Sequence, residues 1–294
     1  GGSGHKVTLI MSQRDEWLSE MEAAAQAAAK DTGINLTTQD ANSDTSKMIQ
    51  YIESSVTAGE DAIIINMVDP ETAAQCVEAA GDVPVVFVNR FPGDPSVLNE
   101  KAVYVGSDEM TSGAFQGEFL AKFFKDQGKT DISYLMLNGI LGQTSTTNRT
   151  ASVLKALEDN GIKATAAAAP LAADYDRATA MDMISPLLKT TKYDCIISNN
   201  DAMALGALQA IQSAGRTVGT DIYLVGVDAL SEALEDVLAG TMTGTVFNDH
   251  FSQSHSAADA AINFINGETN EYYIGCDYVK VTKDNAQEIL DMVK

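Results

Sequence analysis

Basic residues are scarce in this chain, and long apolar runs are absent. Its 294 residues include 19 Lys and Arg against 41 Asp and Glu, which gives a formal net charge of −22 at pH 7. A field of that sign repels nucleic acid and anionic membrane surfaces, so we exclude DNA and RNA as partners. No stretch approaches the roughly 20 apolar residues that a membrane-spanning helix requires.

Cysteine and histidine are also rare, with three of each. Cys76, Cys195 and Cys276 lie far apart in apolar contexts, which indicates buried thiols and neither a disulfide framework nor a zinc site. His250 and His255 are five residues apart near a predicted helix start, a poor spacing for a shared metal ion. We therefore expect no metal site.

Catalytic signatures are missing as well. The chain has no GxGxxG after its first predicted strand, no GxxxxGK[ST] phosphate loop, no GxSxG nucleophile turn and no HExxH helix. No nucleophile is paired with a base in a recognisable motif. We expect a protein that is not an enzyme and needs no cofactor.

What the chain does have is an alternation of strand and helix patterns, which occurs twice. Short apolar strands separated by helical patterns are predicted over 6–11, 34–38, 61–67, 83–89 and 102–105, and again over 132–137, 162–167, 193–197, 222–227 and 244–247. A length of 294 residues is enough for two domains. The pattern predicts an α/β protein of two doubly wound, Rossmann-like lobes with parallel sheets.

The last part of the chain sets the predicted topology. From Gln253 on, the sequence predicts a helix, two short strands and a final helix. A return to the first lobe after Asn248 and a second crossing near Gly275 would join the lobes by a three-segment hinge that can close on a ligand. We place the N-terminal lobe at 6–109 with 249–275 and the C-terminal lobe at 110–248 with 276–294. Residues 1–5 (GGSGH) look like an artificial remnant ahead of a mature domain.

The stretch 198–206 (SNNDAMALG) joins a buried strand to a helix. Ligands of open α/β sheets bind at this kind of junction, beyond the carboxyl ends of the strands. We expect Asp201 to cap the helix. Asn200 is the better ligand group, because an amide both donates and accepts and so suits a neutral polyhydroxyl molecule.

Further polar and aromatic residues fall at predicted strand ends or just beyond them. With Asn200, the candidate ligand-binding set is Asp15, Trp17, Asn89, Gln143, Arg149, Tyr175, Asn200, Asp228 and Asn248. Planar carboxylate, amide and guanidinium groups can each bind neighbouring sugar hydroxyls. Trp17 and Tyr175 could stack on the apolar faces of a sugar ring, although either one alone fits core packing equally well.

Three stretches carry a resemblance to a known family. They are NNDAMALGAL (199–208), GVDALSEAL (226–234) and GTVFND (244–249), while VVFVNR (85–90) is common to a wider ribose-binding and repressor-core superfamily. In this combination the chain, from about Val7 to its end, resembles the type I periplasmic sugar-binding proteins of ABC transporters. It is most similar to the galactose/glucose-binding branch.

The resemblance implies roles for individual residues. Asp15 and Asn89 would bind hydroxyls from the first lobe, and Trp17 would stack on the ring. The second lobe and hinge would contribute Arg149, Asn200, Asp228 and Asn248 as hydroxyl ligands. Tyr175 stands where the family has Trp.

Two departures from the family are visible. Gln143 and Ser145 replace a His and an Asp, so one contact near the anomeric carbon would be weaker or mediated by water. Lys125–Asp131 is too short and has too few carboxylates for the calcium loop of the family, so we expect no structural calcium.

The sequence thus predicts an extracytoplasmic solute-binding protein of an ABC importer, either periplasmic or lipid-anchored outside a Gram-positive membrane. We expect a monomer that captures D-glucose or D-galactose between its lobes and delivers it to the permease, with a chemoreceptor as a second candidate partner. Ribose, xylose and inositol remain alternative ligands. From a different class, the effector-binding core of a transcriptional repressor shares the predicted fold, but would need a helix-turn-helix ahead of the first strand.

Overall fold

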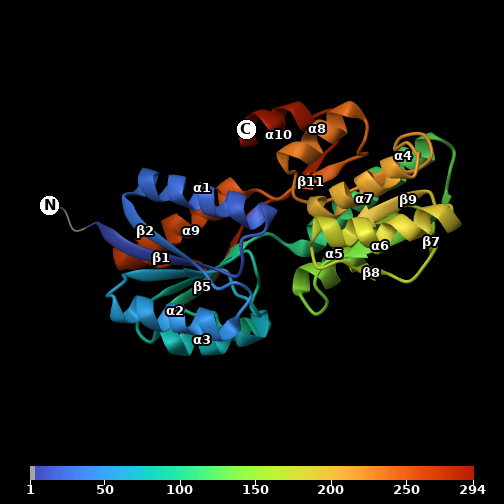
Figure 1. The fold of residues 1–294 in the computed structure, drawn as a ribbon. Helices are drawn as coiled ribbons and strands as arrows, with labels where there is room; N and C mark the ends of the chain where they lie inside the picture. The colour runs from blue at the N-terminus through green and yellow to red at the C-terminus, as the bar shows by residue number, and fades with distance from the viewer. Residues whose placement is uncertain (1–3) are drawn as a thin grey trace. The chain divides into compact units, whose positions relative to one another are not determined.

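The computed structural model describes residues 4–294. Of the predicted remnant 1–5, residues 1–3 lie outside the described part, whereas His5 begins the first strand and pairs with Ile34. The chain divides into two compact units (Figure 1). Unit 1 comprises the chain up to Ser107 together with Asp249–Asp277, and unit 2 comprises Asp108–Asn248 together with Tyr278–Lys294. We expected breaks after residues 109, 248 and 275.

Unit 1 is built on a parallel six-stranded sheet in the order β12-β5-β4-β3-β1-β2. Its strands are β1 (His5–Met11), β2 (Ile34–Asp40), β3 (Ala62–Ile65), β4 (Val85–Val88), β5 (Ala102–Gly106) and β12 (Tyr273–Gly275). Helices α1 (Glu16–Thr32) and α9 (His250–Ile265) pack together on one face, and α2 (Thr45–Thr57) and α3 (Ala73–Ala80) cover the other (Figure 1). Because both faces are covered, the central strands are apolar along their whole length.

The ends of the helices in unit 1 follow the local sequence. Asp44 caps α2 by accepting a hydrogen bond from the amide of Lys47 (3.1 Å). Gly33 ends α1 in the left-handed conformation (φ 76°), which a residue without a Cβ atom adopts readily. Asp69 and Pro70 open a short 3-10 turn, Pro70–Thr72, ahead of α3.

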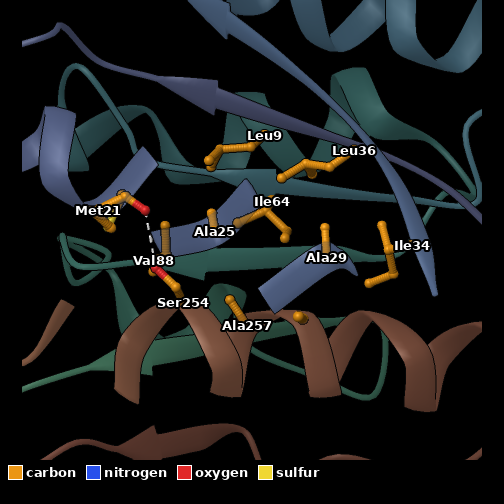
Figure 2. A pocket seen from close by; sticks show the side chains of 11 residues that line it. Leu9, Met21, Ala25, Ala29, Ile34, Leu36, Ile64, Val88, Ser254 and Ala257 are labelled. Atoms are coloured by element: carbon orange, nitrogen blue, oxygen red, sulfur yellow. Dashed lines mark hydrogen bonds between the residues drawn. The ribbon is translucent and has the colours of Figure 1, made fainter. Parts of the chain in front are cut away.

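A small apolar void lies between α1, α9 and the sheet (Figure 2). Its volume is about 10 Å³, and its wall includes Leu9, Ala25 and Ala257. Ser254 lies at its edge and donates its hydroxyl hydrogen to the carbonyl of Met21 (3.1 Å). A void of that size holds one water at most, so it is a packing defect and not a ligand site.

Unit 2 contains a second parallel sheet in the order β10-β9-β6-β7, with β8 also paired to β6. Its strands are β6 (Asp131–Asn138), β7 (Lys163–Ala166), β8 (Leu171–Ala172), β9 (Cys195–Ser198) and β10 (Tyr223–Val225). Helix α4 (Glu109–Asp126) packs against α5 (Thr144–Asp159), and α6 (Arg177–Thr190) packs against α7 (Asp201–Ser213). Strand β8 was not expected, because two residues are too few to show a periodicity.

One predicted strand pairs in an unexpected way. Strand β11 (Thr245–Phe247) runs antiparallel to β13 (Val279–Val281), beside the helix pair α8 (Ser231–Ala239) and α10 (Ala286–Val293). Isolated parallel bridges, Val225 with Gly244 and Asp228 with Phe247, join this part of the chain to the end of β10 and to the segment after it. The partner of β11 lies in the returning chain, so local periodicity could not reveal it.

The two parallel doubly wound units confirm the predicted fold class. Among residues 4–294, no helix combines the length and the apolar character that crossing a bilayer would demand.

Candidate functional site

The nine candidate residues fall into two sets, one in each unit. Unit 1 holds Asp15, Trp17 and Asn89. Unit 2 holds Gln143, Arg149, Tyr175, Asn200, Asp228 and Asn248. Three of the nine have backbone angles in the left-handed region, namely Asn89 (φ 70°), Tyr175 (φ 62°) and Asp228 (φ 129°). Non-glycine residues rarely adopt such angles, and their concentration in this set is typical of a functional site.

In unit 1, Asp15 and Asn89 follow strands β1 and β4. Asp15 caps α1 by accepting a hydrogen bond from the amide of Leu18 (2.8 Å). Burial raises the pKa of its carboxyl group, an effect that the Leu18 amide and the charge of Arg90 reduce without cancelling. The side-chain amide of Asn89 donates to Gln253 Oε1 in the first turn of α9 (3.3 Å). Both side chains are half-buried at the carboxyl edge of the sheet.

Trp17 lies in the first turn of α1 and is 6% exposed. Its ring meets the ring of His250 edge-on, at 6.4 Å between centroids and with an interplanar angle of 90°. Its contact with a sugar stays a prediction.

Arg90 was not among the candidates, although it directly follows Asn89. Its guanidinium donates to the carbonyl oxygens of Met67 (2.8 Å) and Val68 (3.3 Å). Its position beside Asp15 makes it part of the same polar edge. The sequence could have indicated Arg90, because it directly follows Asn89 at the end of an apolar strand.

In unit 2, Tyr175 is held in place by the start of α5. Its hydroxyl forms hydrogen bonds with those of Ser145 (2.6 Å) and Thr146 (3.0 Å). Its ring lies so close to Gly139 that a Cβ atom on Gly139 would collide with it. Burial raises the pKa of the phenol, so Tyr175 stays neutral. The ring is therefore held in one position. Gln143, two residues before Ser145 in the sequence, is the N-cap residue of α5 and makes no side-chain capping bond.

The cap of α7 differs from the sequence prediction. Asn200, not Asp201, is the N-cap, because it is the last extended residue (φ −147°, ψ 171°) and its Oδ1 accepts from the amide of Met203 (3.0 Å). Asp201 is fully buried instead. Its carboxylate accepts from the hydroxyl of Thr245 (2.7 Å) and the amide of Leu230 (3.0 Å), and so ties the start of α7 to β11 and to the segment after β10.

Burial raises the pKa of Asp201 to about 6, against its hydrogen bonds, which lower it. The folded state therefore binds this proton more tightly than the unfolded state, whose carboxyl group titrates near 3.8. The stability that Asp201 contributes is fully present below pH 3.8 and is lost as the pH rises through about 6.

We expect the variant Asp201→Asn to lose this part of the pH dependence. Between pH 4.5 and 7.5 the urea unfolding midpoint of the parent should fall relative to that of the variant, because only the parent has a buried carboxyl group that must ionise. The corresponding change at exposed Asp221 in the same unit is the control. An Asp201→Asn effect of equal size at both pH values would contradict the raised pKa.

Asp228 and Asn248 form a second buried pair in unit 2, with 5% and 2% of their surface exposed. The side-chain amide of Asn248 donates to Asp228 Oδ1 (3.2 Å), and its backbone amide donates to the carbonyl of Asp228 (3.2 Å). The left-handed backbone at Asp228 continues into Ala229 (φ 62°). A carboxylate held in this way is fixed as a hydrogen-bond acceptor.

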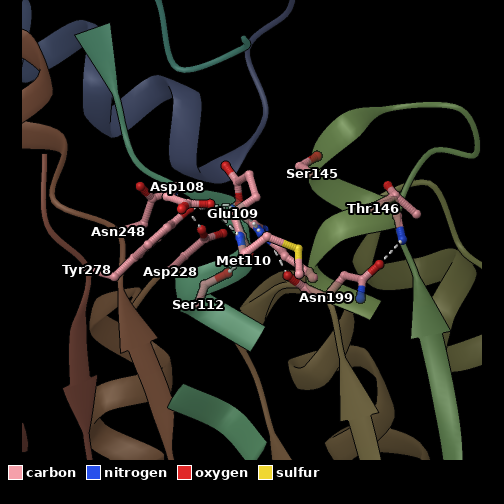
Figure 3. Close-up of polar contacts among 12 residues, drawn as sticks. Asp108, Glu109, Met110, Ser112, Ser145, Thr146, Asn199, Asp228, Asn248 and Tyr278 are labelled. Carbon is pink, nitrogen blue, oxygen red and sulfur yellow. Dashed lines mark hydrogen bonds and ion pairs between the residues drawn. The ribbon is translucent and has the colours of Figure 1, made fainter. Parts of the chain in front are cut away.

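Arg149 is the centre of a buried charged cluster. Its partners Glu109, Asn199 and Tyr278 are labelled in Figure 3. Its Nε donates to Glu109 Oε2 (2.7 Å), its Nη1 to the carbonyl of Asn199 (2.8 Å) and its Nη2 to the hydroxyl of Tyr278 (3.2 Å). The Tyr278 hydroxyl also donates to Glu109 Oε2 (2.8 Å). Burial alone would lower the pKa of Arg149, but Glu109 and the other acidic groups around it raise it well above its usual value.

Glu109, Asn199 and Tyr278 were missed as members of this cluster. Glu109 lies shortly after the end of β5, and Asn199 directly follows β9. Both could therefore have been predicted from their positions after strands, like the other candidates. Tyr278 lies 169 residues beyond Glu109, and nothing in the local pattern indicates their contact. Within residues 4–294, no three His, Cys, Asp or Glu side chains lie together as a metal site would require.

Known proteins resemble this chain over nearly its whole length. A family model described as a periplasmic binding protein domain matches residues 7–269. A D-galactose/methyl-galactoside binding periplasmic protein of Haemophilus influenzae is 32% identical over 306 residues, which cover 96% of this chain and 90% of that protein. A proposed rhizopine-binding protein of Rhizobium meliloti is 32% identical over 259 residues, covering 87% of this chain and 82% of its own.

Solved structures agree with these matches. The structure of an ABC transporter solute binding protein from Bacillus halodurans, with bound myo-inositol, superposes with a TM-score of 0.85 at 29% identity. The match covers 99% of both chains.

Proposed function

Since the chain belongs to the periplasmic binding protein family, as its resemblance indicated, we propose that it binds one neutral monosaccharide or cyclic polyol and delivers it unaltered to the permease of an ABC importer. It would do so outside the cytoplasmic membrane, in a periplasm or from a lipid anchor.

The observation that carries this proposal is the set of buried polar side chains in unit 2. Arg149, Asn200, Asp228 and Asn248 come from four different segments, and each is less than a tenth exposed. Protein hydrogen bonds hold all four side chains in fixed positions. Amide, carboxylate and guanidinium groups can each form more than one hydrogen bond, and a ligand with several hydroxyls supplies both donors and acceptors. Asp15 and Asn89 of unit 1 offer the same chemistry. We propose that both sets contact one ligand, so that the ligand favours a closed arrangement of the two units.

D-galactose and D-glucose are the ligands we favour. The Haemophilus influenzae relative is named for D-galactose and methyl-galactoside, and Gln143 can bind a primary hydroxyl, because an amide donates and accepts.

Myo-inositol is the second candidate, and one contact favours it. Ser145 bonds to the hydroxyl of Tyr175 (2.6 Å), so this position offers no carboxylate to a sugar's anomeric hydroxyl. A ligand without an anomeric hydroxyl has no contact to lose at position 145. The Bacillus halodurans structure holds myo-inositol.

Thermal unfolding in the presence of galactose, glucose, myo-inositol, ribose and xylose tests the proposal. A ligand at 100 times its dissociation constant stabilises a protein by about 2.7 kcal/mol, so the true ligand should raise the melting temperature by several degrees. Calorimetry should then give a dissociation constant on the order of 1 μM, or about −8 kcal/mol. Chromatography should recover the ligand unchanged. No stabilisation by any of the five, or an altered ligand, would contradict the proposal.

A further inference from the structure

The chain passes between the units at three places. Next to each of them, a residue of unit 2 is linked to the buried cluster around Arg149. The chain enters unit 2 at Asp108, leaves it after Asn248 and enters again at Tyr278. Glu109 directly follows the first crossing, and Tyr278 is the first residue after the third. Arg149 donates to Glu109 (2.7 Å) and to Tyr278 (3.2 Å), and Tyr278 donates to Glu109 (2.8 Å). Glu109 and Tyr278 are labelled in Figure 3.

The second crossing is tied to the same cluster through Asp228. Asn248, the last residue before that crossing, donates its side-chain amide to Asp228 Oδ1 (3.2 Å). The carboxylate of Asp228 in turn interacts electrostatically with Arg149. Each of the three crossings therefore has a residue fixed, directly or through one neighbour, to a single guanidinium.

Strong, buried hydrogen bonds hold the side chains of this cluster in place. Arg149 and Tyr278 are each 5% exposed and Glu109 is 9% exposed, so their charge-assisted hydrogen bonds lie in a medium of low dielectric constant, where such bonds are strong. The bonds to Glu109, Asn199 and Tyr278 use three of the five N–H groups of the guanidinium. The same side chain thus has donors left for a ligand.

We propose that Glu109 and Tyr278 are positioning residues that form a clamp with Arg149. The clamp holds the unit 2 ends of the connecting segments against a residue of the candidate ligand site. It couples contact between the ligand and Arg149 to the motion of unit 1 relative to unit 2. The ligand part of this inference rests on the proposed function, whereas the mechanical part does not.

Distances between spin labels on the two units test the clamp directly. The labels are placed at Glu53→Cys in α2 and Glu158→Cys in α5, both exposed. The three native cysteines are buried, and burial raises the pKa of each thiol, so they react slowly. Pulsed electron resonance then gives the distribution of the distance between the units with and without ligand.

The variant Tyr278→Phe removes only the hydroxyl that joins Glu109 and Arg149. Without ligand, its distance distribution should be wider than that of the parent, and its affinity for the identified ligand should fall about tenfold. Glu109→Gln, which removes the charge and keeps the shape, should do the same. The control is Tyr223→Phe, whose ring packs against the same core as Tyr278 but whose hydroxyl lies 3.5 Å from Gln127.

The possible outcomes distinguish a failure of the clamp proposal from a failure of the proposed function. If Tyr278→Phe and Glu109→Gln fold with the parent's circular dichroism spectrum and keep the parent's distance distribution, the clamp is wrong, even if affinity falls. A widening that also occurs in Tyr223→Phe would equally overturn it. If the parent binds none of the sugars tested, the proposed function fails, but the distances without ligand still decide whether the clamp exists.

Discussion

Replacing Arg149 by methionine should lower the free energy of unfolding by about 3–5 kcal/mol, the usual cost of removing one partner of a buried ion pair. Glu109 would lose its cationic partner in a site where it is 9% exposed, with the Tyr278 hydroxyl as its remaining close partner. The carbonyl of Asn199 would also lose its bond to the guanidinium. Urea unfolding followed by circular dichroism measures the loss, and sugar binding should disappear in the same variant.

Two further variants show whether charge is the cause. The double variant Glu109→Met with Arg149→Met replaces the ion pair by apolar groups of similar size and should recover most of the stability, but not the binding. Lys155→Met, at an exposed position on the same helix, should change stability by no more than about 0.5 kcal/mol. A double variant as unstable as the single one would show that packing, and not an uncompensated charge, explains the loss.

The variant Asp228→Asn should weaken binding of the identified ligand by about 2 kcal/mol, or about thirtyfold, because one oxygen of the fixed carboxylate becomes a donor. Asn is the mildest replacement here, since Asn and Asp tolerate positive φ better than other side chains with a Cβ atom. Titration calorimetry gives the change in affinity, and urea unfolding should show a smaller effect than that of Arg149→Met.

Asp221→Asn is the matched control for this prediction. Asp221 lies in the same unit and is exposed, and its carboxylate accepts a bond from the amide of Thr217 (3.1 Å). Its replacement should leave the affinity unchanged. Parent-like affinity in Asp228→Asn would remove Asp228 from the ligand site and would leave unit 2 without its proposed carboxylate.

Apart from β8, the strands of the two parallel sheets and the helices between them could be predicted from local sequence patterns. Buried strands such as β3 and β4 show as short apolar runs, because both of their faces are covered. Asp44 and Gly33 mark helix ends through bonds and angles that involve only their near neighbours. Local periodicity and capping chemistry are therefore enough to predict two parallel α/β units, and the strand-end positions of Asn200 and Asp228 follow from them.

Which strand-end residues contact one another could not be predicted from these local patterns, because it depends on how distant segments pack. Asn200 took the cap that we assigned to Asp201, because Asp201 bonds to Leu230 and Thr245, 29 and 44 residues away. Arg149 lies 40 residues from Glu109 and 129 from Tyr278, yet the three form one buried cluster. A periodic pattern describes the surroundings of a residue along the chain, whereas the partner of a buried charge is set by how distant segments pack.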